Sequence, residues 1–387
     1  MIIVYVADEN YLGMIKKSMV SYRKYNPTAH FVVVSERPLD IDVENVVIDI
    51  GEHRGLTRIS NAAYLKLYLT KLPHDKIIYV DCDTLCQYPL NELWEMPCDY
   101  INLCETYWEK QLQEFGHYGL TGMMVMNLNA LRDDNFTEKC LEVEKTYPTP
   151  QTGWRHDETC INVAYKDKIN YIDDKWNYCH NREYGTRAIH EWDAKILHIV
   201  GHDKSYMDNF PLYSKEKGLL DYLKGKNVAI VGNAQSQFEK NYGKEIDKAE
   251  IVIRFNKGFI SKPESQGTKT NILMLACDLT DDELSSYGAE IIVNRSKNRH
   301  NKADYTISDE DRAVLRDKIY ICQPSTGFIA IDLCLTANAK SITTYGFDWE
   351  KTPTFYNPQF YKTKHNYGRE EELVRLYEKS GILTIKE

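Results

Sequence analysis

The sequence predicts an α/β protein of two domains. Short apolar runs, typical of strands buried on both faces of a parallel sheet, alternate with segments of helical period. The pattern restarts at residue 227, after a lysine-rich connector at residues 208–226 that has Pro and Gly near its ends. A chain of 387 residues also exceeds the size at which a single hydrophobic core usually stops growing. We therefore place the domains at residues 1–215 and 216–387.

Within residues 1–215, strand patterns and helix patterns alternate along the chain. The helix that leads into the run KIIYV has Ser60 or Asn61 as its expected cap. A last strand ends at His198. The remaining strands are expected at residues 2–7, 30–36, 43–51, 76–80, 100–105 and 122–131, and the helices at residues 12–22, 59–73, 89–97 and 156–167.

Two carboxylates, Asp81 and Asp83, end the strand KIIYV. Because side chains alternate along a strand, both point to the same side where the strand ends, and open α/β sheets bind ligands there. Two carboxylates on one side suit Mg²⁺ or Mn²⁺, whose remaining positions would be filled by water and substrate phosphates. On its own, an Asp-x-Asp pair is more often a solvated turn, so the neighbouring motifs must decide.

The end of the first strand carries Ala7 and Asp8, with Tyr11 close behind. A carboxylate and a ring at this position suit a nucleotide, the first for its base or ribose and the second for stacking. Capping of the following helix is an equally good interpretation of Asp8.

With these segments in order, residues 1–215 resemble the family 8 retaining glycosyltransferases, which have the GT-A fold and include bacterial lipooligosaccharide galactosyltransferases and glycogenin. The matching segments are VADENY, YLKL, IIYVDCDTL, LTGMMVMNL, HDETCIN and ILHIVGHDK. The resemblance implies a UDP-hexose donor, UDP-Gal or UDP-Glc. It also implies that Mn²⁺ or Mg²⁺ is bound by Asp81, Asp83 and His198, the uridine by Asp8 and Tyr11, and the diphosphate by Lys204.

Three positions that would border the donor sugar depart from the family pattern. Lys66 stands where the family usually has Arg, Leu120 where it has Asn, and Glu158 where it often has Gln. They leave the identity of the donor open. We expect Lys66 to contact the donor and Asp157 to accept a sugar hydroxyl, and we treat Glu158 as a candidate nucleophile.

In residues 216–387, polar side chains again follow apolar strands. NVAIVG runs into a turn with Asn233 and Ser236, whose backbone and side-chain donors suit an anion, although one such turn can be merely a turn. Asn256 ends the next strand, and a further strand lies at residues 341–349. A buried helix begins at Ser325, Thr326 and Gly327, and the last helix begins at His365.

This half resembles the sialyltransferases of families 29 and 42, which are inverting and use CMP-sugars. NVAIVGNAQS with EIDKAEIVIRFN matches their long motif, PSTGFIAIDLCL with TTYGFD the short one, and HNYGRE the very short one. A Tyr-rich third motif is missing unless Tyr356 or Tyr361 takes its place. The resemblance implies that CMP is bound by Asn233 and Asn256, that cytidine, phosphate or the sugar carboxylate is held by Ser325, Thr326 and Gly327, and that the base is His365.

The expected chemistry agrees with these residue types. Inverting transfer needs a group of near-neutral pKa to take the proton of the acceptor hydroxyl, and that is the range of histidine, here His365. Glu370, five residues on, would orient His365 or cap the helix. CMP can leave without a metal, because hydroxyls, amides and a helix N-terminus can hold its phosphate.

Composition limits the partners of the chain. It is 43% hydrophobic and 27% charged, as soluble globular proteins are, and its net charge of −9 argues against a nucleic-acid binder. Ten cysteines without a Cys-x-x-Cys pair indicate reduced cytoplasmic thiols. The first residues enter a strand directly, so we expect no secretion signal and no membrane span. Peripheral contact with the inner membrane stays compatible with these features.

Together these features predict a bifunctional bacterial enzyme that adds a hexose from a UDP-sugar and sialic acid from CMP-sialic acid to a glycan or glycolipid acceptor, in capsule or lipooligosaccharide synthesis. One alternative is that the second domain uses CMP-Kdo or another CMP-keto-sugar. Another is that only one domain is active and the other is a lectin-like glycan-binding module.

Overall fold

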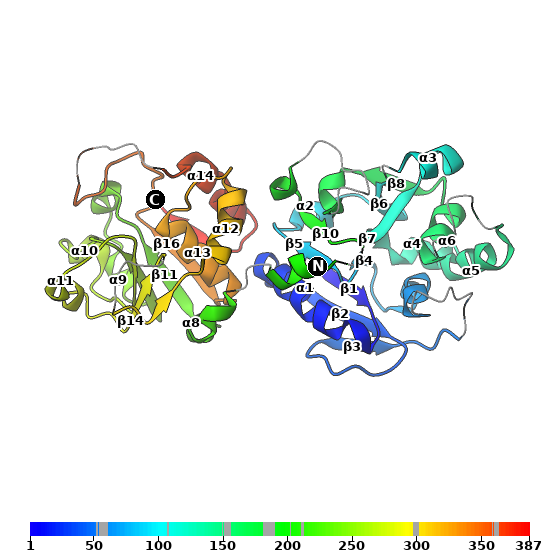
Figure 1. Cartoon of the computed structure of the whole chain (residues 1–387), viewed down its shortest axis with the longest axis horizontal. Helices are drawn as coiled ribbons and strands as arrows, with labels where there is room; N and C mark the ends of the chain where they lie inside the picture. Colours follow the sequence, from blue (N-terminus) through cyan, green and yellow to red (C-terminus); the bar gives the residue numbers. More distant parts are fainter. Residues whose placement is uncertain are drawn as a thin grey trace. The chain divides into compact units, whose positions relative to one another are not determined.

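The structure is a computed structural model that describes residues 1–51, 53, 61–106, 108–148, 150, 156–180, 190–201, 203–209, 213–296, 302–357, 359 and 364–387. The chain divides into two compact units, Met1–Asp208 (unit 1) and Asn209–Glu387 (unit 2) (Figure 1). Ser60 and Tyr361 lie outside the described residues. All ten cysteines are free thiols. No helix among the described residues is long and apolar enough to cross a membrane.

The main sheet of unit 1 has seven strands in the order β3-β2-β1-β4-β7-β6-β8. The strands are β1 (Ile2–Val6), β2 (His30–Ser35), β3 (Glu44–Val47), β4 (Lys76–Val80), β6 (Ile101–Glu105), β7 (Gly119–Asn127) and β8 (Ile169–Ile172). The sheet is mixed, because β7 runs antiparallel to β4 and β6 while the other neighbours are parallel. Both faces of β4 are buried, which accounts for its uninterrupted apolar run.

A small second sheet of unit 1 consists of β5 (Thr84–Cys86), β9 (Tyr178–Cys179) and β10 (Ile196–His198). Strand β5 begins just after Asp83, and β10 pairs with it antiparallel, so that His198 lies opposite Thr84. This pairing joins segments more than a hundred residues apart in the sequence. It brings His198 to the end of β4.

One expected helix and one expected strand of unit 1 fold differently from the sequence prediction. The helix expected at residues 59–73 is a 3-10 helix over its described part. The strand expected at residues 122–131 ends at Asn127, whose side-chain oxygen accepts from the N–H of Ala130 at 3.2 Å and so caps the next helix. The helices are η1 (Glu9–Tyr11), α1 (Leu12–Tyr25), η2 (Asn61–Lys71), α2 (Asn91–Glu95), α3 (Glu109–Phe115), α4 (Leu128–Asp133), α5 (Phe136–Thr146), α6 (His156–Ala164), η3 (Asp174–Trp176), η5 (Glu191–Asp193) and α7 (Ser205–Asn209).

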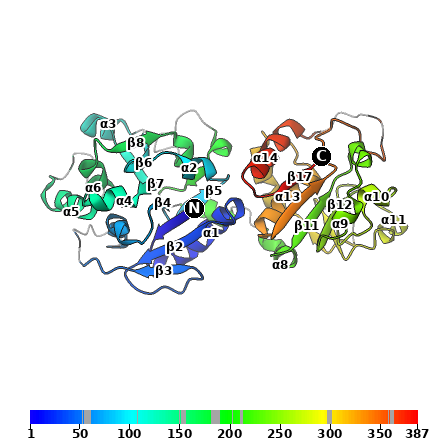
Figure 2. The same ribbon diagram turned by 180° about the vertical axis from the view of Figure 1, so that it is seen from behind.

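Unit 2 contains an all-parallel sheet in the order β15-β14-β13-β12-β11-β16-β17, which Figure 2 shows from behind. The strands are β11 (Asn227–Val231), β12 (Ile251–Phe255), β13 (Ile272–Leu275), β14 (Ile291–Asn294), β15 (Tyr305–Thr306), β16 (Ser341–Tyr345) and β17 (Thr384–Lys386). The strand order reverses between β11 and β16. Open α/β sheets bind their ligands at such a switch point, beyond the carboxyl ends of the strands.

Helices cover this sheet, and α13 packs against β11, β12 and β13. The helices of unit 2 are η6 (Ser214–Glu216), α8 (Lys217–Leu223), η7 (Gln235–Glu239), α9 (Gly243–Ile246), α10 (Pro263–Gln266), α11 (Asp281–Ser285), α12 (Asp309–Lys318), α13 (Thr326–Thr336) and α14 (Tyr367–Lys379). The expected two-domain α/β architecture is therefore confirmed.

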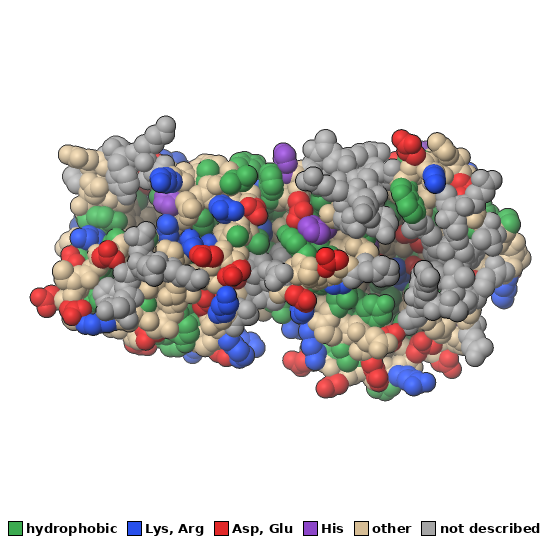
Figure 3. Space-filling model, viewed as in Figure 1, with side chains coloured by type: hydrophobic (Ala, Val, Ile, Leu, Met, Phe, Trp, Pro, Cys, Tyr) green, Lys and Arg blue, Asp and Glu red, His purple; other side chains and the backbone are tan. Residues whose placement is uncertain are grey.

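The border between the two units lies earlier in the chain than the sequence pattern suggested. The expected border after residue 215 lies inside unit 2, because Tyr213 belongs to its core. The backbone N–H of Tyr213 donates to Oδ1 of Asp311 at 3.1 Å, and its hydroxyl donates to Oδ2 of Asp332 at 2.9 Å. On the face shown in Figure 3, the described Lys and Arg side chains are scattered among Asp and Glu and form no single basic patch.

Candidate functional site

The first candidate site is the group of Asp81, Asp83 and His198 at the end of β4. Nε2 of His198 lies 3.2 Å from Oδ1 of Asp83 and 3.7 Å from Oδ2 of Asp81. One ligand atom from each of the three residues lies within 4.8 Å of the others. The sequence predicted these three residues as metal ligands, and the fold brings them together.

Two neighbours fix the ring of His198. Nδ1 lies 3.1 Å from the side-chain oxygen of Asn177, so the ring turns Nε2 toward the carboxylates. Gly122 makes room for the ring, because a Cβ there would lie 2.1 Å from Cε1 of His198. Metal-bound histidines usually donate their other ring N–H to an oxygen in the same way. Two carboxylates and one imidazole are also ligands that Mn²⁺ accepts, so these residues fit a divalent cation.

Lysines neutralise the carboxylates around this group. Nζ of Lys204 lies 2.6 Å from Oδ2 of Asp83, and Nζ of Lys66 lies 3.0 Å from Oδ1 of Asp81. Burial would raise the pKa of Asp83, but His198 and Lys204 outweigh it and hold that pKa well below its ordinary value. Burial would lower the pKa of Lys66, but the nearby Asp157 and Asp81 raise it overall. Asp83 and Lys66 therefore both carry their charges at neutral pH.

Asp157 and Glu158 begin α6 and lie beside β7. Oδ2 of Asp157 lies 2.9 Å from Nζ of Lys66, and Oε2 of Glu158 accepts from the backbone N–H of Thr121 at 3.2 Å. Asp157 is buried. Lys66 thus links Asp157 to Asp81, so one of the three positions that depart from the family pattern connects the start of α6 to the end of β4.

The expected nucleotide-binding residues lie at the end of β1. The side chain of Asp8 accepts from the backbone N–H of Asn10 at 2.9 Å and caps η1, which is one of the two roles that the sequence left open. The ring of Tyr11 is exposed. Burial raises the pKa of Tyr11, and the carboxylates of Asp8, Asp83 and Asp81 raise it further. Ala7 is buried and donates its N–H to Val34.

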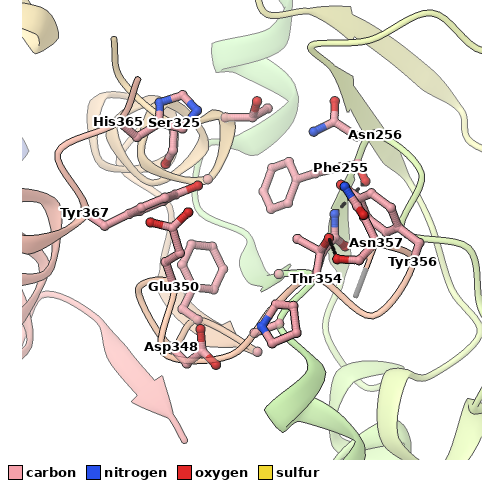
Figure 4. Close-up of a pocket in the computed structure, with 18 of the residues that line it drawn as sticks. Phe255, Asn256, Ser325, Asp348, Glu350, Thr354, Tyr356, Asn357, His365 and Tyr367 are labelled. Atoms are coloured by element: carbon pink, nitrogen blue, oxygen red, sulfur yellow. Dashed lines mark hydrogen bonds between the residues drawn. The ribbon is translucent and has the colours of Figure 1, made fainter. Parts of the chain in front are cut away.

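The second candidate site is a cavity of about 470 Å³ in unit 2, at the switch point of the sheet (Figure 4). It lies beyond the carboxyl ends of β11, β12, β13, β14 and β16 and at the start of α13. Six residues predicted from the sequence line it: Asn233, Asn256, Ser325, Thr326, Gly327 and His365. Figure 4 shows His365 and Tyr367 on one side of the cavity and Asn256, Tyr356 and Asn357 on the other. Tyr356 is one of the two tyrosines suggested for the missing third motif.

The two asparagines are held by backbone groups. Nδ2 of Asn233 donates to the carbonyl of Phe255 at 3.1 Å, and Oδ1 of Asn256 accepts from the N–H of Ala276 at 2.6 Å. This leaves the side-chain oxygen of Asn233 and the amide NH₂ of Asn256 to meet a ligand. One acceptor and one donor suit the edge of a nucleobase.

His365 is held as a neutral imidazole. Nδ1 lies 2.7 Å from the backbone carbonyl of Gln323, so it carries a proton and donates it, and in the neutral ring Nε2 then has the lone pair. Burial lowers the pKa of His365 and the charge of Arg295 lowers it further, and these two effects outweigh the hydrogen bond to Gln323 and the charge of Glu350, which raise it. The ring is therefore able to accept a proton at neutral pH.

Glu370 takes a different place from the two that the sequence suggested. Its buried carboxylate accepts from the backbone N–H of Ser325 at 2.7 Å and from the hydroxyl of Ser325 at 2.6 Å. It therefore holds the start of α13, and it neither orients His365 nor caps its own helix, where Asn366 is the cap.

Ser236 also departs from its expected role. Its hydroxyl donates to Oδ2 of Asp348 at 2.9 Å, together with the hydroxyl of Thr352, and Ser236 does not line the cavity. Its hydroxyl joins two loops, because Asp348 lies 112 residues further along the chain. The turn after a strand suggested that Ser236 donates a hydrogen bond to an anion. Only the fold shows that its hydroxyl donates to Asp348 instead.

Sequence reasoning missed Arg295, Trp349 and Glu350, which also line the cavity. Arg295 directly follows β14, so its place after an apolar run at the same sheet edge was the available signal. Trp349 and Glu350 adopt left-handed backbone conformations, with φ of 56° and 67°. Nothing in their residue types predicted this conformation.

The family model for glycosyl transferase family 8 matches residues 2–209, more than half of the chain. The chain belongs to glycosyl transferase family 8. The match covers Asp81, Asp83 and His198, and with them the whole of the first candidate site. The model for glycosyltransferase family 29 (sialyltransferase) matches residues 180–301, which include Asn233 and Asn256, and it confirms the second resemblance.

This family 8 chain is 24% identical over 133 residues to general stress protein A of Bacillus subtilis, a match that covers 31% of this chain and 46% of that protein. The chain thus spans less than half the length of this curated relative. It is 20% identical over 303 residues to glycosyltransferase GlyB of Streptococcus pneumoniae, with 72% of this chain and 70% of GlyB covered. Among solved structures, galactosyltransferase LgtC with donor and acceptor sugar analogues is 16% identical, has a TM-score of 0.45 and matches 56% of this chain and 99% of its own.

Proposed function

We propose that this family 8 chain is a bifunctional glycosyltransferase of bacterial surface-glycan synthesis. Unit 1 transfers a hexose with retention from UDP-Gal or UDP-Glc, and unit 2 transfers sialic acid with inversion from CMP-sialic acid. The acceptor is a glycan or glycolipid of the capsule or lipooligosaccharide. The observation that carries the proposal is that one chain holds both a carboxylate–histidine group in unit 1 and a cavity of about 470 Å³ lined by a histidine in unit 2.

In unit 1, the proposed ligands of Mn²⁺ or Mg²⁺ are Asp81, Asp83 and His198. When bound, such an ion offsets the negative charge that develops on the departing diphosphate. Lys204, whose Nζ lies 2.6 Å from Oδ2 of Asp83, would contact the same diphosphate. Asp157, held by Lys66, accepts a hydroxyl of the donor sugar, and Tyr11 stacks on the uracil.

The first test is the metal dependence of the two transfers. EDTA should abolish release of UDP from the UDP-hexose and leave release of CMP from CMP-sialic acid unchanged, because the ligands lie only in unit 1. Asp83→Ala should have the same selective effect. Asp167→Ala, which removes an exposed carboxylate of unit 1, is the matched control. UDP-hexose turnover that persists in EDTA would exclude the metal site.

In unit 2, His365 is the proposed general base. Its Nε2 takes the proton of the acceptor hydroxyl while that oxygen forms a bond to the anomeric carbon of sialic acid. The bond from this carbon to the phosphate oxygen breaks, and CMP leaves with the electron pair. The hydrogen bond from Nδ1 to Gln323 supports this role, because it fixes the tautomer that a base requires.

The second test replaces His365 with Gln. Transfer from CMP-sialic acid should fall by about 10²–10⁴, as for a lost acid–base group, while CMP affinity and UDP-hexose turnover stay unchanged. In the parent protein, transfer should decline only below the ordinary pKa of histidine, because the pKa of His365 is lowered. His117→Gln, at an exposed position of unit 1, is the control. Near-normal transfer, or a parallel loss of CMP binding, would assign His365 a structural or donor-binding role.

A further inference from the structure

The start of α13 faces the cavity, but some of the hydrogen-bond donors that could bind an anion there already bond to a carboxylate of the protein. The N–H and the hydroxyl of Ser325 both donate to the carboxylate of Glu370. The same hydroxyl oxygen accepts from the N–H of Phe328 at 3.1 Å. An anionic substrate therefore finds the donors of Ser325 engaged, with a carboxylate behind them. The N–H groups of Thr326 and Gly327 at the same helix start meet only part of its charge, and another group is needed for the rest.

Arg295 stands where that group is needed. It directly follows β14, and its backbone N–H donates to the carbonyl of Leu275 at 2.8 Å, so it continues the sheet edge at which the cavity lies. Its side chain lines the cavity together with Ser325 and His365. The charge of Arg295 also changes the pKa of two groups near the start of α13. Its charge lowers the pKa of His365, and at Glu370 it opposes the rise that burial causes.

The other charged side chains of the cavity have different surroundings. Nζ of Lys257 lies 3.6 Å from Oε1 of Glu283. Asp348 accepts from Ser236 and Thr352, and Glu350 carries the wrong charge to bind an anion. Arg295 is therefore the cation of this cavity that combines a place at the sheet edge with proximity to the proposed base.

We propose that Arg295 recognises the sugar carboxylate of the CMP-linked donor and thereby selects keto-acid sugars over neutral ones. This inference rests on the proposed function of unit 2. In sialic acid and in Kdo the carboxylate is bonded to the anomeric carbon, so a side chain that holds it also positions the carbon that reacts. A guanidinium suits this task, because its planar fork matches both oxygens of a carboxylate.

The test compares two ligands on Arg295→Met. A non-transferable analogue of CMP-sialic acid contains the carboxylate and the phosphate, whereas CMP contains the phosphate alone. The variant should bind the analogue about 10- to 100-fold more weakly, the scale of a lost charge-assisted contact, and bind CMP within about twofold of the parent protein. Arg295→Lys should recover part of the loss, because it restores the charge without the fork.

Lys257→Met is the matched control, because it removes the same charge from the same cavity. It should change the affinities for the analogue and for CMP by the same factor.

A second readout is the pH profile of transfer. His365 has Arg295, Glu350 and the carbonyl of Gln323 around it, so loss of Arg295 should move the acid limb of the profile to higher pH.

The outcomes separate the inference from the function on which it rests. If Arg295→Met weakens CMP and the analogue equally, the arginine binds the phosphate and the inference is wrong. If neither affinity changes, Arg295 has no part in donor binding and the inference is again wrong. If the parent protein binds neither CMP nor the analogue, the proposed function of unit 2 itself fails. Thermal melts of each variant show whether the fold is kept.

Discussion

At the scale of single residues, the geometry of the unit 1 site depends on a missing side chain. A Cβ on Gly122 would lie 2.1 Å from Cε1 of His198, far inside van der Waals contact. Gly122→Ala should therefore push the imidazole away from Asp83. We expect Mn²⁺ binding to weaken by about 10- to 100-fold, the range seen when groups that orient a metal ligand are lost. Calorimetric titration of the variant with Mn²⁺ would measure this.

Gly13 offers the matched control for this substitution. It lies in α1, and a Cβ there would meet nothing within 4 Å. Gly13→Ala should leave Mn²⁺ binding unchanged and raise the free energy of unfolding by less than the about 0.5–1 kcal/mol that Gly costs relative to Ala in the middle of a helix, because Gly13 is in the first turn of α1. Unchanged Mn²⁺ affinity in Gly122→Ala would show that the ring of His198 is not needed in its present position.

At the scale of elements, α13 and α14 are joined through the buried pair of Glu370 and Ser325. Burial raises the pKa of Glu370 from its ordinary value of 4.5 to about 7, although Ser325 and Arg295 act in the opposite direction. Between these two values the folded protein binds more protons at this site than the unfolded chain does. Glu370 therefore favours folding at low pH, and this contribution is lost as the pH rises toward 7.

Glu370→Gln removes this titration and keeps an oxygen that can accept from Ser325. The free energy of unfolding of the variant, relative to that of the parent protein, should therefore rise between pH 4.5 and pH 7. Urea unfolding of unit 2 at several pH values would measure this difference. Glu372→Gln, at an exposed position of the same helix, is the matched control. A constant difference for Glu370→Gln would mean that this carboxyl does not titrate in the window.

The same elements show what the sequence can predict. The apolar run before Asp81 and the one before Asn233 were recognisable, because strands buried on both faces must be apolar along their whole length. The pairing of β10 with β5 was not, since it joins distant segments and leaves no periodic signal. His198 could be assigned only through the family resemblance. The partner of Glu370 likewise lies 45 residues away, so its role at α13 depended on the fold.

Local patterns failed where one polar residue decided between two structures. Asn127 ends an apolar run that continues with Leu128, and hydrophobicity alone extends the strand to residue 131. The side chain of Asn127 instead caps α4, as asparagine does readily. Arg295 was missed for a different reason. An arginine after a strand is ordinary, and only its place in the cavity beside His365 distinguishes it.

At the scale of the whole molecule, the division into two units raises the question of where the chain can be cut. Tyr213 is fully buried, and its two hydrogen bonds to Asp311 and Asp332 lie within unit 2. Glu216, which follows closely, is buried as well. Tyr213 and Glu216 therefore belong to the core of unit 2, although the sequence around them is lysine-rich and typical of a connector.

We expect the two units to fold and act separately when the chain is cut between residues 208 and 209. Fragment 1–208 should release UDP from the UDP-hexose, and fragment 209–387 should release CMP from CMP-sialic acid, each at the rate of the intact chain.

Fragment 216–387, cut at the border that the sequence suggested, lacks Tyr213. It should be less stable than fragment 209–387 by about 3–5 kcal/mol, the cost of truncating a large buried aromatic side chain. Urea unfolding of the two fragments measures the difference, and Tyr213→Phe, which removes only the hydroxyl, should account for a small part of it. Equal stability of the two fragments would return the border to residue 215. Inactive fragments from an active parent chain would mean that the units depend on each other.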